Sequence, residues 1–287
     1  CVCISREYLL NQCHGFGGEG LRCHHYRYVP NAPPSSSLVY FSFMNCDCKR
    51  SAHPVGPSRR VVGSSESRVA IALVSGGIDS PVAVARMANA GWTIYPMHCS
   101  QEPITGREAE EKTLSTLSHL ANPDGPLAEN AGGIMKELMV IPVGEVLAMF
   151  TKPESHRDYF VHMKRLFNLL GCLIAKEVEA THLITGENLG QVSSQTLGNL
   201  GAVELASSLP ILRPLLGLDK QEIIDEAREL GTFDISKGPE LCDVLGPKRP
   251  TTVANIERLE GNEEALGGLM ELAKSCYSQR RFEPLSL

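Results

Sequence analysis

The chain has 287 residues, of which 43% are hydrophobic and 21% are charged, the composition of an ordinary soluble globular protein. Its longest apolar runs, VAIALV at 69–74 and LLGCLIA at 169–175, are far shorter than a membrane span, so we expect no membrane partner. Residues 1–68 hold eight Lys and Arg against four Asp and Glu, about +4, whereas residues 69–287 hold nineteen against twenty-nine, about −10. This balance excludes the larger part as a general nucleic-acid binder, because such binding depends on cations that neutralise phosphates.

Residues 1–68 show neither helical nor strand periodicity and are predicted to be an irregular, Cys-rich segment or linker. NAPPSSS at 31–37 and HPVGPSRRVVGSSES at 53–67 have turn and linker composition. The C-x-C pairs at 1–3 and 46–48 match no familiar zinc-ligand spacing. The pattern therefore favours disorder, or upstream sequence that is not natively translated, over a zinc site.

The start of the chain and the distribution of its cysteines indicate the cellular compartment of the protein. CVCISREYLL lacks both an initiator Met and the basic leader and apolar region of a secretory signal, which indicates a fragment or an incorrectly assigned start. Six of the ten cysteines lie in the first 48 residues. The others are widely spaced, as in a reducing compartment where thiols stay free. We expect a cytoplasmic protein.

A regular alternation of elements begins after Arg68. VAIALVS at 69–75 predicts a strand that is buried on both faces, and residues 79–90 have apolar positions at helical spacing. Residues 92–99 predict a second strand, and residues 106–121 predict a charged amphipathic helix. This order is typical of strands joined by helical crossovers.

The alternation continues through the second half of the chain. ELMVIPV at 137–143 predicts a third strand, followed by a long helix from about 155 to 179. Residues 181–187 and 208–215 predict a fourth and a fifth strand. Residues 219–231 predict a helix with an acidic first turn and a terminal glycine.

Together these elements predict an α/β fold with a doubly wound parallel sheet of about five strands. The irregular segment of residues 1–68 would precede it. The α/β domain would extend over residues 69–250, and residues 251–287 would form a short helical C-terminal extension.

The sequence SGGIDS at 75–80 lies where the first strand turns into the first helix. Gly76 and Gly77 allow unusual backbone angles and close approach of an anion to backbone amides, and the helix that begins near Asp79 directs its positive dipole end to the same place. No Lys follows as in a P-loop, and the G-x-G-x-x-G spacing is missing. An acidic residue in an anion site makes sense if Mg²⁺ bridges it to phosphates. The alternative is a tight turn in which Asp79 only caps the helix.

SGGIDS resembles the PP-loop of ATP pyrophosphatases, enzymes that cleave ATP between its α and β phosphates and adenylate a substrate. Three further segments are similar to motifs of one subfamily: TGENLGQVSSQTLGNL (185–200), LPILRPLLGLDKQEI (209–223) and GPELCDVLGPKRPTT (238–252). That subfamily is the tRNA 4-thiouridine synthetases, also called thiamine-biosynthesis sulfurtransferases. The resemblance covers roughly residues 69–255 and implies an adenine nucleotide alpha hydrolase-like fold.

The resemblance implies ATP and Mg²⁺ as cofactors and no metal site built from protein ligands alone. Asp79 would lie near the Mg²⁺. The residues that would cradle the β and γ phosphates are Ser75, Gly76, Gly77, Asp79 and Ser80.

The remaining nucleotide contacts implied by the resemblance are Leu73, Val74, His98, Cys99, Lys164, Gly186 and Gln195. His98 and Cys99 match the adenine-contacting pair. Lys164 stands where the family has a basic residue, but the surrounding MKRLFNLLG departs from the usual pattern.

Three residues receive catalytic roles by the resemblance: Asp79, Lys220 and Cys242. Lys220 would stabilise developing negative charge during adenylation, although by itself it fits a surface lysine at the start of a helix. Cys242 matches the acceptor cysteine that carries sulfur as a persulfide, although by itself it fits a small, partly buried residue. The implied reaction adenylates O4 of a tRNA uridine with release of pyrophosphate, and the persulfide then displaces AMP.

The chain also departs from the family pattern. Residues 1–68 do not resemble the ferredoxin-like and THUMP regions that bind tRNA, and the chain ends before a rhodanese domain would begin. The C-x-x-C pair of some members is absent at Cys242. Met97 stands where some members have a second redox cysteine, and Cys99, two residues on, would face the same side of the strand and could substitute.

The implied partners are tRNA, bound weakly or with the help of another protein, and a cysteine desulfurase as sulfur donor; a homodimer is left open. Two other functions also remain open. One is a different PP-loop adenylating enzyme, such as an amide-forming synthetase, which would not need Cys242. The other is a truncated chain that binds ATP and depends on a separate tRNA-binding partner.

Overall fold

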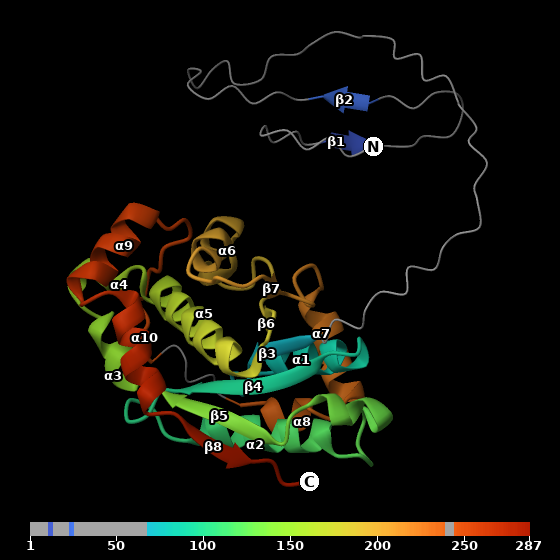
Figure 1. Ribbon diagram of the computed structural model, residues 1–287. Coiled ribbons are helices and arrows are strands. Elements are labelled where there is room, and N and C mark those ends of the chain that lie inside the picture. The colour runs from blue at the N-terminus through green and yellow to red at the C-terminus, as the bar shows by residue number, and fades with distance from the viewer. Residues whose placement is uncertain (1–10, 14–22, 26–67, 239–243) are drawn as a thin grey trace. The chain divides into compact units, whose positions relative to one another are not determined.

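The computed structural model describes residues 11–13, 23–25, 68–238 and 244–287 (Figure 1). The chain divides into two compact units, residues 1–62 and 63–287. In the first unit, β1 (Asn11–Cys13) pairs antiparallel with β2 (Cys23–His25), a pairing that the sequence did not predict. The C-x-C pairs at 1–3 and 46–48 lie outside the described residues.

The second unit is built on a six-stranded sheet with the order β7-β6-β3-β4-β5-β8. Its five strands from β7 to β5 are parallel, which confirms the predicted sheet. The C-terminal strand β8 runs antiparallel to β5, so the prediction that the last residues are helical is wrong there. The strands are β3 (Val69–Leu73), β4 (Thr93–Ser100), β5 (Glu137–Pro142), β6 (His182–Ile184), β7 (Ile211–Leu212) and β8 (Arg281–Pro284).

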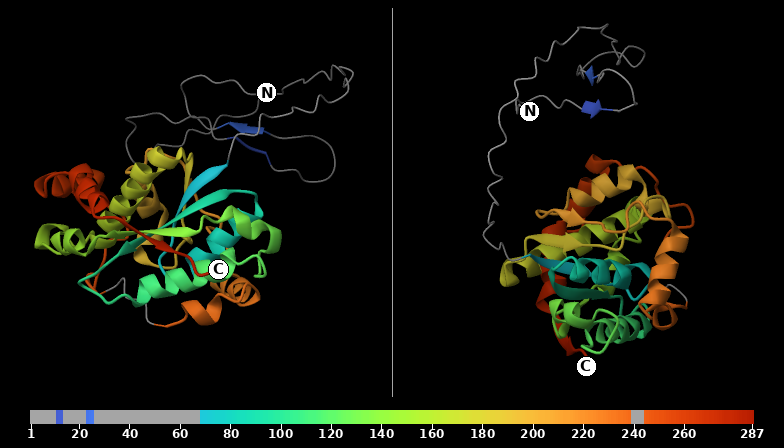
Figure 2. Two further views of the ribbon diagram at one scale, coloured as in Figure 1. Left: turned by 60° about the horizontal axis from the view of Figure 1, so that its bottom comes forward. Right: turned by 90° about the vertical axis from the view of Figure 1, so that its right-hand side faces the viewer.

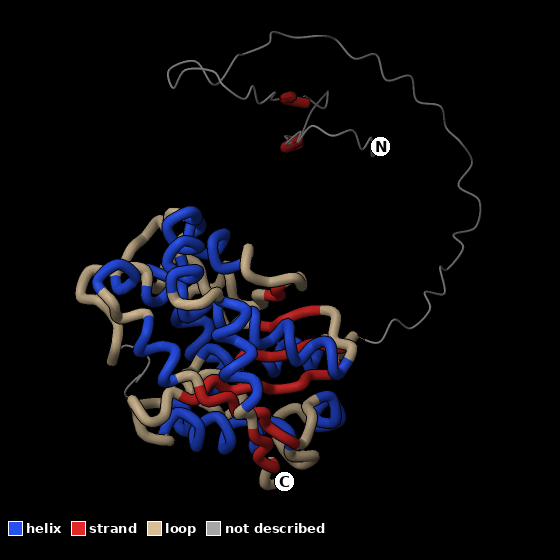
Figure 3. Tube along the Cα trace, turned by 60° about the vertical axis from the view of Figure 1, so that its left-hand side comes forward, coloured by secondary structure: helices blue, strands red, loops and turns tan. Residues whose placement is uncertain are grey.

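Helices cover both faces of this sheet (Figure 2, Figure 3). Side chains alternate along a strand, so Ala70 and Ala72 of β3 belong to one hydrophobic core and Ile71 belongs to the other. The doubly wound prediction is therefore confirmed. The first core includes residues of α1 (Asp79–Asn89), α2 (Glu108–Ala121) and α7 (Lys220–Glu229). The second includes residues of α3 (Gly144–Met149), α5 (Tyr159–Val178) and α10 (Leu269–Ser278).

Two predicted elements differ from the structure for local reasons. The helix expected over 155–179 is divided into α4 (Pro153–His156) and α5, and between them the buried Asp158 carboxylate accepts hydrogen bonds from Arg258 Nε at 2.8 Å and Nη2 at 2.9 Å. The strand expected over 208–215 contracts to two residues because Pro210 and Pro214, on either side, have no backbone N–H to donate.

Further helices complete the unit. Arg258 belongs to α9 (Ile256–Ala265). Helices α9 and α10 confirm the predicted helical structure near the C-terminus. The sequence did not predict α3, α6 (Leu197–Glu204) and α8 (Phe233–Ser236), which are short. Across the described ranges, no helix combines the length and the apolar character that a membrane crossing requires.

A buried carboxylate ties the unpredicted strand β8 to helix α2. Glu110 is 1% exposed; it receives one hydrogen bond from Arg107 Nη2 at 2.6 Å and another from Arg281 Nη2 on β8. Burial alone would raise the pKa of Glu110, but the two guanidinium groups outweigh it and hold the pKa below its ordinary value of 4.5. Arg281 thus compensates a charge that would otherwise be buried at high cost.

We expect an Arg281→Met chain to be less stable than the wild type by about 1–3 kcal/mol at neutral pH, because Glu110 loses one of its two charged partners. The folded-state pKa of Glu110 is lowered, so its stabilising contribution is complete above 4.5 and is lost as the pH falls through the folded pKa. The difference between the chains should therefore shrink in acid. Urea unfolding at neutral and acidic pH measures both effects, with the exposed Arg228→Met as control. Equal stability at neutral pH would contradict the prediction.

Candidate active site

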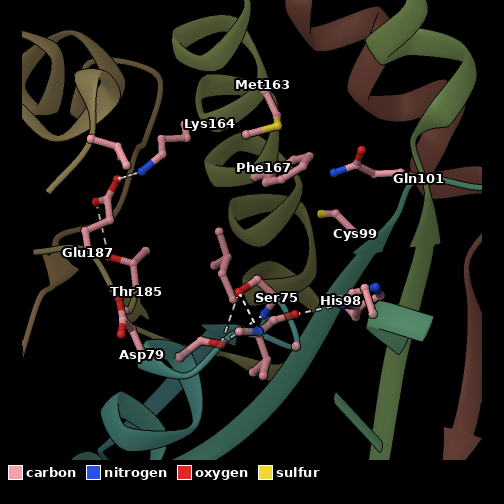
Figure 4. A pocket seen from close by; sticks show the side chains of 18 of the residues that line it. Ser75, Asp79, His98, Cys99, Gln101, Met163, Lys164, Phe167, Thr185 and Glu187 are labelled. Carbon is pink, nitrogen blue, oxygen red and sulfur yellow. Dashed lines mark hydrogen bonds and ion pairs between the residues drawn. The ribbon is translucent and has the colours of Figure 1, made fainter. Parts of the chain in front are cut away.

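A cavity of about 870 Å³ lies beyond the carboxyl ends of the central strands (Figure 4). The chain leaves β3 for β4 on one side and later returns as β6 on the other, so the connections after β3 and β6 diverge. Such a switch point is where parallel α/β sheets bind ligands, and the volume lies within the roughly 300–1,000 Å³ usual for small-molecule sites.

The structure brings thirteen of the predicted site residues together around this cavity. These are Leu73, Val74, Ser75, Gly76, Gly77, Asp79, Ser80, His98, Cys99, Lys164, Gly186, Gln195 and Lys220. The fourteenth, Cys242, lies outside the described residues. Residues on both sides of it, Lys237 and Gly238 before and Gly246 and Pro247 after, line the cavity.

The SGGIDS loop is a closed turn packed against helix α2. Ser80 Oγ accepts a hydrogen bond from the backbone N–H of Ser75 at 3.0 Å, which joins the two ends of the loop. Gly76 has φ +77°, and a Cβ atom there would collide with the backbone oxygen of Ala109. Both features require glycine at this position. The turn leaves backbone amides and the N-terminus of α1 available to an anion.

A Gly76→Ala chain is expected to bind ATP at least tenfold more weakly than the wild type, since the loop must move away from Ala109 by a distance that misaligns its amides. Isothermal titration with ATP measures this loss. Gly91→Ala is the matched control, because Gly91 has a similar φ of +80° with no atom within 4 Å of the added Cβ. The control should lose only roughly 1–2 kcal/mol of stability, which is the cost of holding an L-residue in the left-handed backbone region. Equal ATP affinity in both variants would contradict the prediction.

Asp79 and Lys220 form an ion pair at the edge of the loop. Lys220 Nζ donates to Asp79 Oδ1 at 2.6 Å. Lys220 is the first residue of α7, whose start is held by a capping box between Asp219 and Glu222. Within the described ranges Oδ2 of Asp79 has no partner, so one oxygen of the carboxylate is left for a ligand.

The segment after β6 packs directly on the start of α1. A Cβ atom on Gly186 would lie 2.8 Å from Cα and from N of Ser80, so the two backbones touch. This contact explains glycine in TGE by close approach rather than by an unusual φ. It also places the motifs of residues 75–80 and 185–200 at one edge of the cavity.

Glu187 organises this edge, although the sequence analysis gave it no role (Figure 4). Its buried carboxylate accepts hydrogen bonds from Lys164 Nζ at 2.8 Å, from Arg213 Nε at 2.8 Å and from Thr185 Oγ1 at 3.2 Å. Burial alone would raise the pKa of Glu187, but Lys164 and Arg213 outweigh it and lower the pKa, so the group stays ionised. The sequence could have indicated this pair, since Glu187 lies in the quoted motif 185–200 and Arg213 lies in the quoted motif 209–223.

His98 and Cys99 form the wall at the end of β4. His98 is buried, and its Nδ1 lies 2.8 Å from the carbonyl oxygen of Val74. Burial lowers the pKa of His98, so the ring is neutral at pH 7 and donates its Nδ1–H to that carbonyl. Burial raises the pKa of the Cys99 thiol well above its ordinary value, so the thiol stays protonated. The structure thus offers no activation of Cys99, and its redox role stays a prediction.

An apolar wall adjoins this strand end. Met163 and Phe167 of α5 lie on the same side of the cavity as Cys99 and Gln101 (Figure 4). Aromatic and thioether side chains suit the flat face of a base. The cavity therefore has a polar end at the SGGIDS loop and an apolar end at α5. In the described part of the chain, no group of three or more His, Cys, Asp or Glu residues could hold a metal ion.

Comparisons with known proteins agree with this geometry. The family described as "Thiamine biosynthesis protein (ThiI)" matches residues 63–267. A probable tRNA sulfurtransferase of Macrococcus caseolyticus is 35% identical over 227 residues, which cover 74% of this chain and 54% of that relative. One of Moorella thermoacetica is 35% identical over 206 residues, with 71% and 50% covered. The chain spans about half the length of the curated relatives that it matches.

A solved structure is also similar. The crystal structure of a 4-thiouridine synthetase–RNA complex with bound ATP superposes with a TM-score of 0.68 and 32% sequence identity over 76% of this chain and 55% of that one. It supports both the fold and the resemblance deduced from the motifs. Since the family match covers most of the chain, the protein belongs to the ThiI family of thiamine biosynthesis proteins.

Proposed function

We propose that the chain is an ATP-dependent tRNA uridine sulfurtransferase that forms 4-thiouridine, with sulfur transfer for thiamine biosynthesis as a second use. The observation that carries the proposal is that one cavity is lined by the SGGIDS loop, by the Asp79–Lys220 pair and by residues on both sides of Cys242 in the sequence. The names of the relatives support the same activity. We expect this activity in the cytoplasm, where tRNA and reduced thiols are found.

ATP would bind with its phosphates at the SGGIDS loop and its base toward the apolar wall. The amides around Gly76 and Gly77 and the N-terminus of α1 suit the phosphate oxygens. Asp79 Oδ2 fits Mg²⁺, which in proteins is held by one or two carboxylates together with substrate phosphates and water. When bound, Mg²⁺ would neutralise phosphate charge. His98 would hold the strand end in place through its bond to Val74.

The first half-reaction would adenylate the uridine. O4 of the uracil attacks the α-phosphorus of ATP, the bond from that phosphorus to the bridging oxygen breaks, and pyrophosphate leaves with the electron pair. The proton on N3 is lost as the ring takes its O4-substituted form. Lys220 would stabilise the charge that develops on the phosphates, an electrostatic role for a preorganised cation.

The second half-reaction would transfer sulfur. A cysteine desulfurase would load Cys242 as a persulfide, and the terminal sulfur would attack C4 of the uracil while AMP departs with the electron pair of the C4–O bond. A second thiol must then reduce the disulfide that joins Cys242 to the new sulfur. Gly238 and Gly246, each four residues from Cys242 in the sequence, line the cavity.

Release of AMP and pyrophosphate by the full chain tests the proposal. We expect release from ATP and Mg²⁺ that depends on unmodified tRNA, and little release with tRNA that already carries 4-thiouridine. Release that is equal with both tRNAs, or that needs no tRNA, would contradict the proposed substrate.

A second candidate is favoured by the net charge of about −10 over residues 69–287. A surface of that charge binds RNA weakly, so a separate subunit could supply the tRNA contacts. This candidate predicts ATP binding with no release of AMP when tRNA is added alone. Release that appears after a tRNA-binding protein is supplied would favour it over the first.

A further inference from the structure

Lys112 of helix α2 is a cation in the cavity wall to which no role has been given. Its side chain is half-buried, and four lysines of the described residues line the cavity. Three of the four pair with carboxylates: Lys164 with Glu187 at 2.8 Å, Lys220 with Asp79 at 2.6 Å and Lys237 with Asp234 at 2.7 Å. Lys112 has no such partner among the residues that the structure describes. A half-buried ammonium group without a counter-ion is costly unless a ligand supplies one.

The nearest acidic residue on the same helix face does not neutralise Lys112. Glu108 stands four positions earlier, the usual spacing of a helical ion pair. Its carboxylate is instead turned toward Gly106, where both Oε atoms lie within 2.8 Å of the position of a Cβ. Within the described ranges no ion pair joins Glu108 to Lys112.

Helix α2 places Lys112 beside the SGGIDS loop. Ala109, one turn before Lys112, is the residue whose backbone oxygen touches Gly76. The Lys112 ammonium group reaches the far part of the cavity wall, where Nζ lies 2.8 Å from the position that a Cβ atom would take on Gly238. Helix α1, which follows the loop, packs against both α2 and α7. The cavity wall therefore has Lys220 of α7 paired with Asp79, and Lys112 of α2 one helical turn after the contact between Ala109 and Gly76.

We propose that Lys112 is a further phosphate-binding residue, which contacts the β and γ phosphates of ATP and stays in contact with pyrophosphate as it leaves. This inference rests on the proposed function, because it assumes that ATP phosphates occupy the loop. ATP brings more negative charge than one Mg²⁺ cancels, and the other lysines of the wall are already paired. Among the lysines of the described cavity wall, Lys112 can supply the remaining charge without breaking an ion pair.

Binding of ATP and AMP to the full chain tests the proposal. We expect Lys112→Gln to weaken ATP binding about ten- to hundredfold, the loss of one charge-assisted contact, and to leave AMP binding unchanged, since AMP lacks the phosphates that Lys112 contacts. Pyrophosphate binding should weaken with ATP binding. Lys112→Arg keeps the charge and should restore most of the ATP affinity. Lys274→Gln, on the outer surface of α10, is the control and should bind both nucleotides normally.

Three results would contradict the proposals. An unchanged affinity of Lys112→Gln for ATP would overturn the proposal. Equal losses for ATP and AMP would also overturn it, because Lys112 would then only shape the cavity. A wild-type chain that binds no ATP would overturn the proposed function itself, so the two failures are distinguishable.

Discussion

A Cys242→Ala chain is expected to bind ATP as tightly as the wild type and to release AMP and pyrophosphate, while formation of 4-thiouridine falls to background. In the proposed reaction, adenylation would need the loop and the Asp79–Lys220 pair, whereas sulfur transfer would need a thiol that can carry a persulfide. Separate assays of AMP release and of 4-thiouridine in tRNA, by its absorbance or by mass spectrometry of nucleosides, measure the two half-reactions. This separation is the largest effect that we expect from a single substitution.

Cys172→Ala is the matched control for the loss of a cysteine. Cys172 belongs to α5 and is buried in the core, where its sulfur lies 3.3 Å from Ser207 Oγ, and it does not line the large cavity. Its replacement should cost some stability and leave thiolation intact. Normal thiolation by Cys242→Ala would contradict the carrier role. AMP release with an acceptor other than tRNA would then favour an amide-forming synthetase.

The second large effect is expected at Asp79. Asp79→Asn removes the carboxylate that pairs with Lys220 at 2.6 Å and that would share Mg²⁺ with the phosphates. We expect AMP release to fall roughly 10²–10³-fold, comparable to the loss of one preorganised electrostatic group in other enzymes. Single-turnover release of AMP under saturating ATP measures this effect apart from weaker binding.

A double variant tests whether Asp79 and Lys220 act as one unit. If they do, Asp79→Asn combined with Lys220→Met should be little slower than the worse single variant, because residues in direct contact are not additive. Asp225→Asn, an exposed member of an ion pair on the same helix α7, is the control and should have normal activity. Fully additive losses would mean that the two residues act independently.

The strands and the main helices could be predicted because their signals are local. VAIALVS is apolar at consecutive positions, as required for a strand with helices on both faces, and β3 lies there with Ala70 and Ile71 in opposite cores. SGGIDS indicated an anion site since its glycines and helix start are adjacent in sequence. The motif resemblance then assigned thirteen residues that the fold collects around one cavity.

The features that were missed depend on contacts between distant parts of the chain. Strand β8 has little strand character of its own; it is held by pairing with β5 and by the ion pair from Arg281 to Glu110, 171 residues earlier. The division between α4 and α5 depends on Arg258, 100 residues after Asp158. No periodicity within either segment encodes such a partner.

The sequence by itself determined the α/β class, the place of the SGGIDS loop and the family, since each rests on residues that are neighbours along the chain. Only the tertiary structure decided which charges in the cavity are already paired. Glu187 pairs with both Lys164 and Arg213, Asp79 pairs with Lys220, and Lys112 is left without a carboxylate among the described residues. Ion pairs depend on distances of a few ångströms between side chains from different elements, and folding sets those distances after the order of residues is given.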